Sequence, residues 1–153
     1  MTEEEKINAK KDAYRLISYR ERSEQELIER LLEKGHNLNI INSIIPRIKE
    51  LGYLDDRRFA EMWVSHKIKH APRGKNMLKK ELQDKGVDSS LIDNVLNDKL
   101  TYQIELEMGR KLAKKWLNRN GNKKNKSLKI KRYLFNKGFV YDIIDEIVNS
   151  FFE

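Results

Sequence analysis

Apolar residues recur along this chain at helical spacing, and the same register is written three times. A Lys-Gly pair marks each copy, at Lys34-Gly35, Lys85-Gly86 and Lys137-Gly138, so the copies lie about fifty residues apart. Each glycine is followed at five, six, nine and ten residues by aliphatic side chains, which are Ile40, Ile41, Ile44, Ile45, then Leu91, Ile92, Val95, Leu96, then Ile143, Ile144, Ile147, Val148. Such repetition favours a stacked array that works through its surface over a catalytic pocket.

Each copy is predicted to hold three helices. In the first helix an alanine is followed at three and four residues by large apolar side chains, as at Ala13, Leu16 and Ile17. The second helix ends at the Lys-Gly pair, where the glycine is expected to adopt the left-handed conformation that closes a helix. The third helix carries the aliphatic run. The sequence therefore predicts an all-α fold of three tandem three-helix, helix-turn-helix-like repeats in an elongated, curved array.

Helix starts and breaks are visible in the same pattern. Ser23 and Glu26 have the spacing of a capping box at the start of a second helix. Asp88 or Ser89 could cap the third helix of the second copy. Pro46 lies inside the third helix of the first copy, where a missing N–H and a steric clash would kink or divide the helix. The sequence leaves both choices open.

Charge is distributed unevenly over the three copies. Residues 1–53, which hold an N-terminal extension and repeat one, carry ten basic and ten acidic side chains. Repeat two, 54–100, carries ten and eight, and repeat three, 101–153, carries twelve and six. No acidic residue occurs from Met108 through Tyr141, so this stretch should attract a polyanion such as DNA or an acidic protein groove. The alternative is a lysine-rich solvated surface with no partner.

Composition excludes several classes of protein. The chain has no cysteine, so neither a disulfide framework nor a thiolate metal site is available. Its acidic start is unlike a secretory signal, and no apolar run has the length of a membrane span. We expect a cytoplasmic protein that is not bound to a membrane.

Residue types that often carry chemistry are better explained by structure here. His66 and His70 stand four apart on one predicted helix, but His36 is the only other histidine, so no metal site is expected. Trp63 and Trp116 occupy equivalent repeat positions and are expected in the core rather than stacked on bases. Without a phosphate loop or a catalytic triad pattern, we expect neither an enzyme nor a bound cofactor.

The segment Gly52-Tyr53-Leu54-Asp55-Asp56-Arg57-Arg58-Phe59-Ala60 lies between the first two copies. Together with Ser23-Glu24-Gln25-Glu26-Leu27 and the triple Lys-Gly repeat, it resembles the RecX family over nearly the whole chain, from about Ala13 to Phe151. The resemblance implies a bacterial regulator of three tandem three-helix units that binds and restrains the RecA recombinase.

This resemblance implies a role in recombination, DNA repair and the SOS response. The expected partner is the RecA filament on single-stranded DNA, whose extension, ATP hydrolysis and strand exchange would be inhibited. We expect the protein to act as a monomer with weak direct binding to DNA. Two alternatives stay open: a helix-turn-helix-type nucleic-acid-binding protein acting without RecA, and a helical scaffold for an unrelated partner.

The predicted contact residues are exposed cations of repeats two and three, where the connector before the second helix is longer and basic. They are Arg73, Lys75, Lys79, Lys114, Lys115, Lys123, Lys124, Lys126, Lys129 and Arg132. The residues of the family motif are expected to be mostly structural, and they are Asp55, Asp56, Arg58, Phe59, Ala60, Gly35, Gly86 and Gly138. A carboxylate at Asp55 or Asp56 would accept free N–H groups at a helix start, and Phe59 would begin a buried face.

Overall fold

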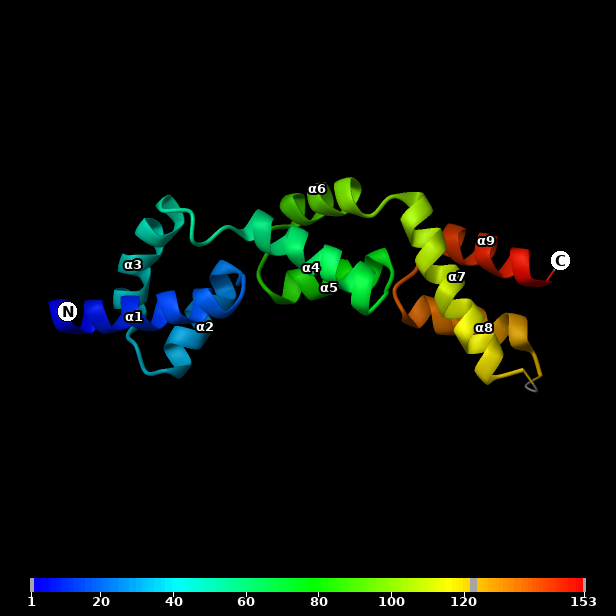
Figure 1. Cartoon of the computed structure of the whole chain (residues 1–153), viewed down its shortest axis with the longest axis horizontal. Coiled ribbons are helices and arrows are strands. Elements are labelled where there is room, and N and C mark those ends of the chain that lie inside the picture. The colour runs from blue at the N-terminus through cyan, green and yellow to red at the C-terminus, as the bar shows by residue number, and fades with distance from the viewer. Residues whose placement is uncertain (1, 122–123, 153) are drawn as a thin grey trace.

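The computed structural model describes residues 2–121 and 124–152, and these residues form nine α-helices and no strand (Figure 1). The helices are α1 (Glu3–Tyr19), α2 (Glu24–Glu33), α3 (Leu38–Glu50), α4 (Asp56–His70), α5 (Lys75–Asp84), α6 (Ser89–Lys99), α7 (Tyr102–Arg119), α8 (Lys126–Asn136) and α9 (Tyr141–Phe152). The predicted all-α fold is confirmed.

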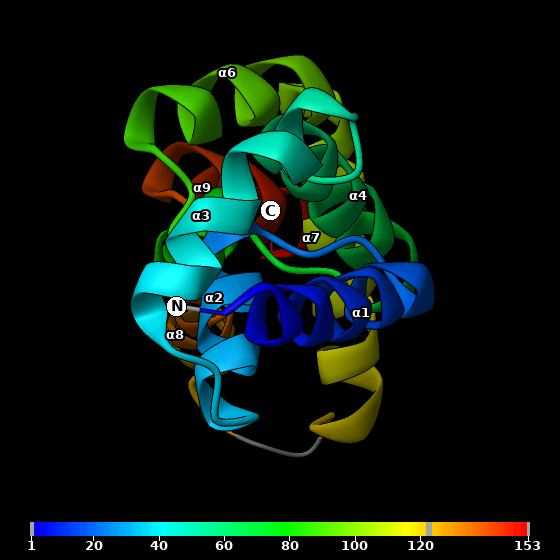
Figure 2. The same cartoon turned by 90° about the vertical axis from the view of Figure 1, so that its left-hand side faces the viewer.

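The nine helices are arranged as three groups of three along one axis. We call α1–α3 unit one, α4–α6 unit two and α7–α9 unit three. The units follow one another in a long, shallow arc with the two termini at opposite ends (Figure 1). Seen from the unit-one end, they lie one behind another (Figure 2). The borders at residues 53 and 100 stay a prediction of the sequence.

Left-handed glycines close the second helix of every unit, as predicted. The φ angles of Gly35, Gly86 and Gly138 are 94°, 79° and 94°. In each closing turn, the residue after glycine donates its main-chain N–H to the carbonyl five positions earlier, at 3.1, 3.1 and 3.2 Å. Only glycine adopts this conformation without strain, which explains why the Lys-Gly pair recurs.

The predicted helix starts are largely confirmed. Ser23 and Glu26 form the capping box of α2, with the Ser23 side chain accepting from the Glu26 N–H and the Glu26 side chain accepting from the Ser23 N–H. Asp88 rather than Ser89 caps α6, because its carboxylate accepts the N–H of Ser90. Pro46 lies on the exposed side of α3, which continues to Glu50, so the helix is not divided.

Buried side chains form two separate apolar cores. One core belongs to unit one and contains Ala9, Ala13, Leu27, Leu31 and the isoleucines of α3. The other is shared by units two and three and runs from Phe59 to Val148. Units two and three are therefore joined by apolar packing, whereas the described contacts between units one and two are mostly polar.

Eleven of the twelve repeated aliphatic side chains are buried, and Leu91 is half-buried. Trp116 is also buried, as expected. The expectation for Trp63 is only partly met: this side chain packs against the shared core but stays half-exposed, since it lies at the edge of unit two beside unit one. Within the described residues, no helix combines the length and apolar character needed to cross a membrane.

Candidate functional site

Two joints hold the three units in line, and each is built at a Lys-Gly pair. In joint one, the start of α2 meets the end of α5: the Ser23 hydroxyl donates to the Lys85 carbonyl at 2.7 Å. In joint two, the start of α5 meets the end of α8: the Gly74 N–H donates to the Lys137 carbonyl at 2.7 Å. In both, N–H or O–H donors at a helix start meet the free carbonyls of a helix end.

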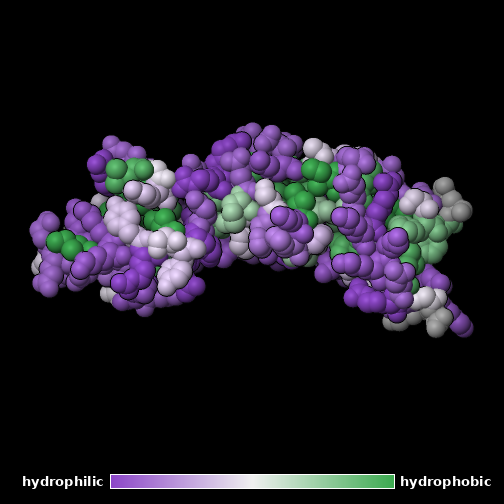
Figure 3. All heavy atoms as spheres, viewed as in Figure 1, coloured by the Kyte–Doolittle hydropathy of each residue, from purple (hydrophilic) through white to green (hydrophobic). Residues whose placement is uncertain are grey.

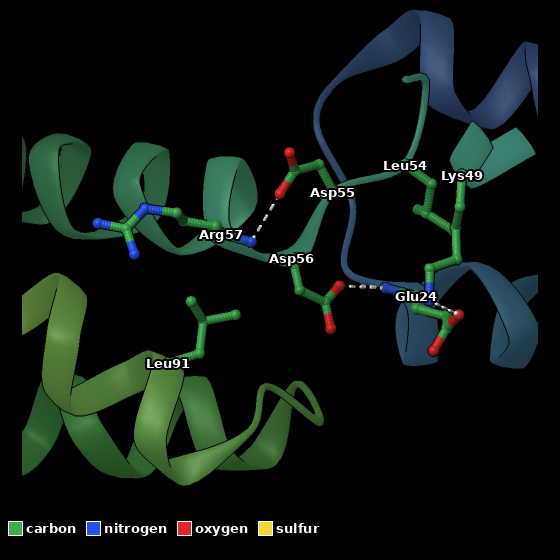
Figure 4. Close-up of a pocket in the computed structure, with 7 residues that line it drawn as sticks. All are labelled: Glu24, Lys49, Leu54, Asp55, Asp56, Arg57 and Leu91. Carbon is green, nitrogen blue, oxygen red and sulfur yellow. Dashed lines mark hydrogen bonds and ion pairs between the residues drawn. The ribbon is translucent and has the colours of Figure 1, made fainter. Parts of the chain in front are cut away.

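A carboxylate from the first helix of the following unit completes each joint. In joint one, Asp56 of α4 accepts the main-chain N–H of Glu24, the first residue of α2, at 2.8 Å (Figure 4). In joint two, the buried carboxylate of Glu105 of α7 lies near the main-chain N–H of Lys75, the first residue of α5, and this N–H acts to lower the carboxylate's pKa. The negative charge lies at the positive end of a helix dipole in both cases.

Ion pairs add to joint one. Glu26 is paired with Arg20 inside unit one and lies 3.4 Å from the Lys85 ammonium of unit two. Arg58 donates to Glu21 across the joint at 2.7 Å. Asp55 instead caps its own helix, accepting the main-chain N–H groups of Arg57 and Arg58. The polar family-motif residues therefore have two structural roles. Asp55 caps the start of α4, while Asp56 and Arg58 attach unit two to unit one.

In joint two, the main chain at the start of α5 lies so close to the turn after α8 that a side chain at Gly74 or Gly138 would not fit. A Cβ atom at Gly74 would overlap the main chain of Gly138 and Phe139. A Cβ atom at Gly138 would overlap Met77, at the start of α5. Gly138 therefore has two roles. Its positive φ closes α8, and its lack of a side chain lets the start of α5 approach. Phe59, Ala60 and Phe139 are fully buried in the core that units two and three share.

Burial shifts the titration of the two joint carboxylates. Desolvation raises the pKa of Asp56, although the N–H of Glu24 partly opposes it. Desolvation likewise raises the pKa of Glu105, whose Oε2 atom is buried with no hydrogen-bond partner among the described residues. Burial also acts to raise the pKa of Glu26, but Arg20 and Lys85 outweigh it and lower that pKa.

Most of the predicted contact residues of unit three lie on α7 and α8, two helices that pack side by side. Lys114 and Lys115 are exposed on α7, and Lys129 and Arg132 are exposed on α8. Lys124, just before α8, is exposed as well, and Lys126, the first residue of α8, is half-buried. Lys123 lies outside the described residues. Within the described part of the chain, none of these six side chains makes an ion pair.

The three predicted contact residues of unit two are placed differently. Arg73 is half-buried and paired with Glu81, and the Lys79 ammonium lies 3.5 Å from an Asp93 carboxylate oxygen. Lys75 is half-buried as the first residue of α5 in joint two. Among the described residues, the six predicted cations of unit three make no ion pair, whereas Arg73 and Lys79 of unit two are paired within the chain. Figure 3 shows hydrophilic residues over most of the face seen there.

A hollow beside joint one contains residues that the sequence reasoning missed. It has a volume of about 490 Å³ and is lined by Arg20, Glu21, Met62, Trp63, His66, Lys67 and Lys85. The ammonium groups of Lys67 and Lys85 lie 4.7 and 5.5 Å from the centre of the Trp63 ring. Because this hollow joins two units, only the tertiary structure reveals it.

Metal-ligating side chains do not gather anywhere in the described part of the chain. The rings of His66 and His70 lie near each other, with centroids 4.7 Å apart. No group of three or more His, Asp or Glu side chains with metal-site geometry occurs in residues 2–121 and 124–152. His36 is engaged elsewhere, with its Nε2 atom 2.6 Å from an Asp12 carboxylate oxygen.

Comparison with known proteins gives matches over the first two units and over the whole chain. The family model described as RecX, first three-helix domain, matches residues 9–47, and that of the second three-helix domain matches 55–96. The Regulatory protein RecX of Chlorobium phaeobacteroides is 32% identical over 140 residues, which are 92% of this chain and 91% of that protein.

A longer relative and a solved structure extend this picture. The Regulatory protein RecX of Bacillus licheniformis is 35% identical over 136 residues, which are 88% of this chain, and the chain spans only 51% of that protein's length. The crystal structure of RecX from Lactobacillus salivarius has a TM-score of 0.88 and 29% identity, covering 97% of both chains. Since two family models and a relative matched along almost its entire length agree, this chain belongs to the RecX family.

Proposed function

We propose that this protein regulates homologous recombination and DNA repair by binding the RecA filament on single-stranded DNA. Bound there, it inhibits filament extension, ATP hydrolysis and strand exchange. Membership of a family named as regulatory supports a role without catalysis of its own. The protein acts in the cytoplasm, needs no cofactor and binds bare DNA only weakly.

The observation that carries this proposal is the row of free cations on α7 and α8. Lys114 and Lys115 on one helix and Arg132 on the other are exposed and make no ion pair within residues 2–121 and 124–152. A nucleoprotein filament is a polyanion, so a positively charged surface that binds it displaces counterions. The release of these counterions favours binding. The three units follow one another in an arc and present their surfaces along it (Figure 1).

A matched pair of charge reversals tests the surface. Lys114→Glu with Lys115→Glu should weaken co-sedimentation with preformed RecA filaments about tenfold, because two cations facing phosphates or acidic side chains become anions. Lys11→Glu with Arg15→Glu makes the same change in charge at exposed positions of α1 and should retain binding. Thermal melts of both double variants should match the parent.

The partner is tested separately. Binding to bare single- and double-stranded DNA is measured across a salt series, and inhibition of RecA's ATPase is measured with and without preformed filaments. Tight binding to bare DNA that RecA does not alter would favour a helix-turn-helix-type protein acting without RecA. If neither DNA nor RecA binds, the chain is a helical scaffold for another partner.

A further inference from the structure

Unit one carries the same joint surface that units two and three use, but nothing occupies it among the described residues. Its Lys-Gly pair, Lys34-Gly35, closes α2 in the same conformation as the other two pairs. A Cβ atom at Gly86 would overlap Gln25 and one at Gly138 would overlap Met77, whereas nothing lies within 4 Å of the Cβ position at Gly35.

The other elements of a joint are present at this place. Glu5 stands eight residues before Ala13 in α1, as Glu105 stands eight residues before Ala113 in α7. A hollow of about 380 Å³ lies between Glu5 and the turn after α2, and it is lined by Glu5, Asn8, Gly35, His36, Asn37 and Ile40. Since the Glu105 carboxylate lies near the N–H of the α5 start in joint two, Glu5 is in register to face an incoming helix start in the same way.

The matching half of a joint is free at the other end of the molecule. The helix start that corresponds to those of α2 and α5 is that of α8, with Lys126 as its first residue. Among the described residues, Asn125 before it makes no side-chain capping bond, and the first turn of α8 contains no acidic residue. The turn after α2 and the start of α8 lie at opposite ends of the arc (Figure 1).

We propose that the hollow of unit one accepts the start of α8 of a second copy of this chain, so that copies join head to tail. Charge complementarity supports a second copy as the occupant: the first turn of α1 carries Glu3, Glu4 and Glu5, whereas the start of α8 has Lys124 and Lys126. The surfaces are different on the two partners, so the contact is open-ended and does not close into a symmetric dimer.

This contact is weak, because the hollow is lined mostly by polar side chains, those of Glu5, Asn8, His36 and Asn37, as joint one is. Joint one is made mainly of hydrogen bonds and ion pairs, and its two units have separate apolar cores. A small polar interface of this kind dissociates readily in dilute solution. The chain is therefore monomeric when dilute and associates at high local concentration, a property that does not depend on which partner the protein regulates.

Cysteine crosslinking tests the contact directly, because the chain has no cysteine of its own. Asn8→Cys places a thiol at the hollow, and Leu128→Cys places one on the exposed face of the α8 start. The two single variants are mixed at about 1 mM and treated with a short bis-maleimide. Asn94→Cys, exposed on α6 away from the hollow, replaces Asn8→Cys in the control mixture.

A head-to-tail contact predicts heterodimers of Asn8→Cys with Leu128→Cys in about tenfold excess over the control mixture, and a yield that falls as salt is added. Glu5→Lys in the Asn8→Cys chain should lower that yield about tenfold, while Glu50→Lys, an equal charge change on exposed α3, should leave it unchanged. Equal yields in the test and control mixtures would overturn the proposal. So would sedimentation of the unmodified chain that is independent of concentration up to about 1 mM.

Discussion

The Ser23 hydroxyl accepts the main-chain N–H of Glu26 at 3.1 Å and donates to the main-chain carbonyl of Lys85 at 2.7 Å. One fully buried side chain thus closes the start of α2 and the end of α5, which belong to different units. The same position in the next joint is Gly74, where the main chain itself makes the contact.

Ser23→Ala should lower the free energy of unfolding by about 1–2 kcal/mol, because it removes a helix cap and leaves the Lys85 carbonyl without its donor. Urea unfolding followed by circular dichroism measures the change. Ser65→Ala, at an exposed position of α4, should change stability by less than about 0.5 kcal/mol. An equal effect of the two substitutions would show that the Ser23 hydroxyl does not stabilise the contact between α2 and α5.

Gly86→Ala should destabilise the protein more than Gly35→Ala. Both substitutions place a side chain in the left-handed region, which costs roughly 1–2 kcal/mol. At Gly86 the added Cβ also collides with Gln25, whereas the space at Gly35 is open. The difference between the two unfolding free energies therefore isolates joint one, and a larger loss from Gly35→Ala would contradict this account.

Gly74→Ala should cost about 1–3 kcal/mol even though its φ of −80° suits any residue. The reason is that the new methyl group would overlap the main chain of Gly138 and Phe139, which has little freedom to move. Gly121→Ala is the matched control, because the nearest atom to its Cβ position is the Leu117 carbonyl oxygen at 3.7 Å. Thermal melts of the two variants should separate clearly.

Glu105→Gln should change how stability depends on pH. Because the folded pKa of Glu105 is raised by burial, the folded state holds its proton more tightly than the unfolded state. This group therefore favours folding at low pH, and its contribution falls as pH rises from the ordinary glutamate pKa through the raised one. Glutamine keeps an oxygen for the Lys75 N–H and removes the buried charge.

The variant should accordingly gain stability relative to the parent as the pH rises above the ordinary glutamate pKa of about 4.3. Urea unfolding at several pH values measures this difference, and Glu107→Gln on the exposed side of α7 provides the control. A pH profile of Glu105→Gln parallel to that of the parent would mean that the carboxylate is not desolvated in solution.

Much of the fold follows from local rules. Helical spacing of apolar residues, the Ser23–Glu26 capping box and the Lys-Gly pairs predict three-helix units, because each of these signals acts within a few residues of chain. The aliphatic side chains after each glycine recur at helical spacing, so they share one face of their helix, and nearly all of them are buried. Pro46 was harder to predict, since its exposed position in α3 depends on which face of that helix packs.

The contact surface was less accessible to sequence reasoning. Arg73 and Lys79 look equivalent to the cations of unit three in the sequence, yet Arg73, before α5, pairs with Glu81 of that helix, and Lys79 pairs with Asp93 of α6. Trp63 has the same register as Trp116. It lies at the boundary between units one and two, where unit one covers only part of the side chain, so Trp63 stays half-exposed. Pairing and exposure depend on how the helices and units pack, which the spacing of residues along the chain does not give.

The sequence by itself determined the helices, their closing turns, the threefold repetition and the concentration of positive charge in the third copy, because these properties depend on residue type and short-range spacing. Only the tertiary structure decided that the Lys-Gly pairs are also the places where units join, and that the pair of unit one is unoccupied among the described residues. The second helix of every unit ends in carbonyl groups that have no partner inside the helix. Whether the start of another helix lies against these carbonyls depends on which unit is the neighbour in space.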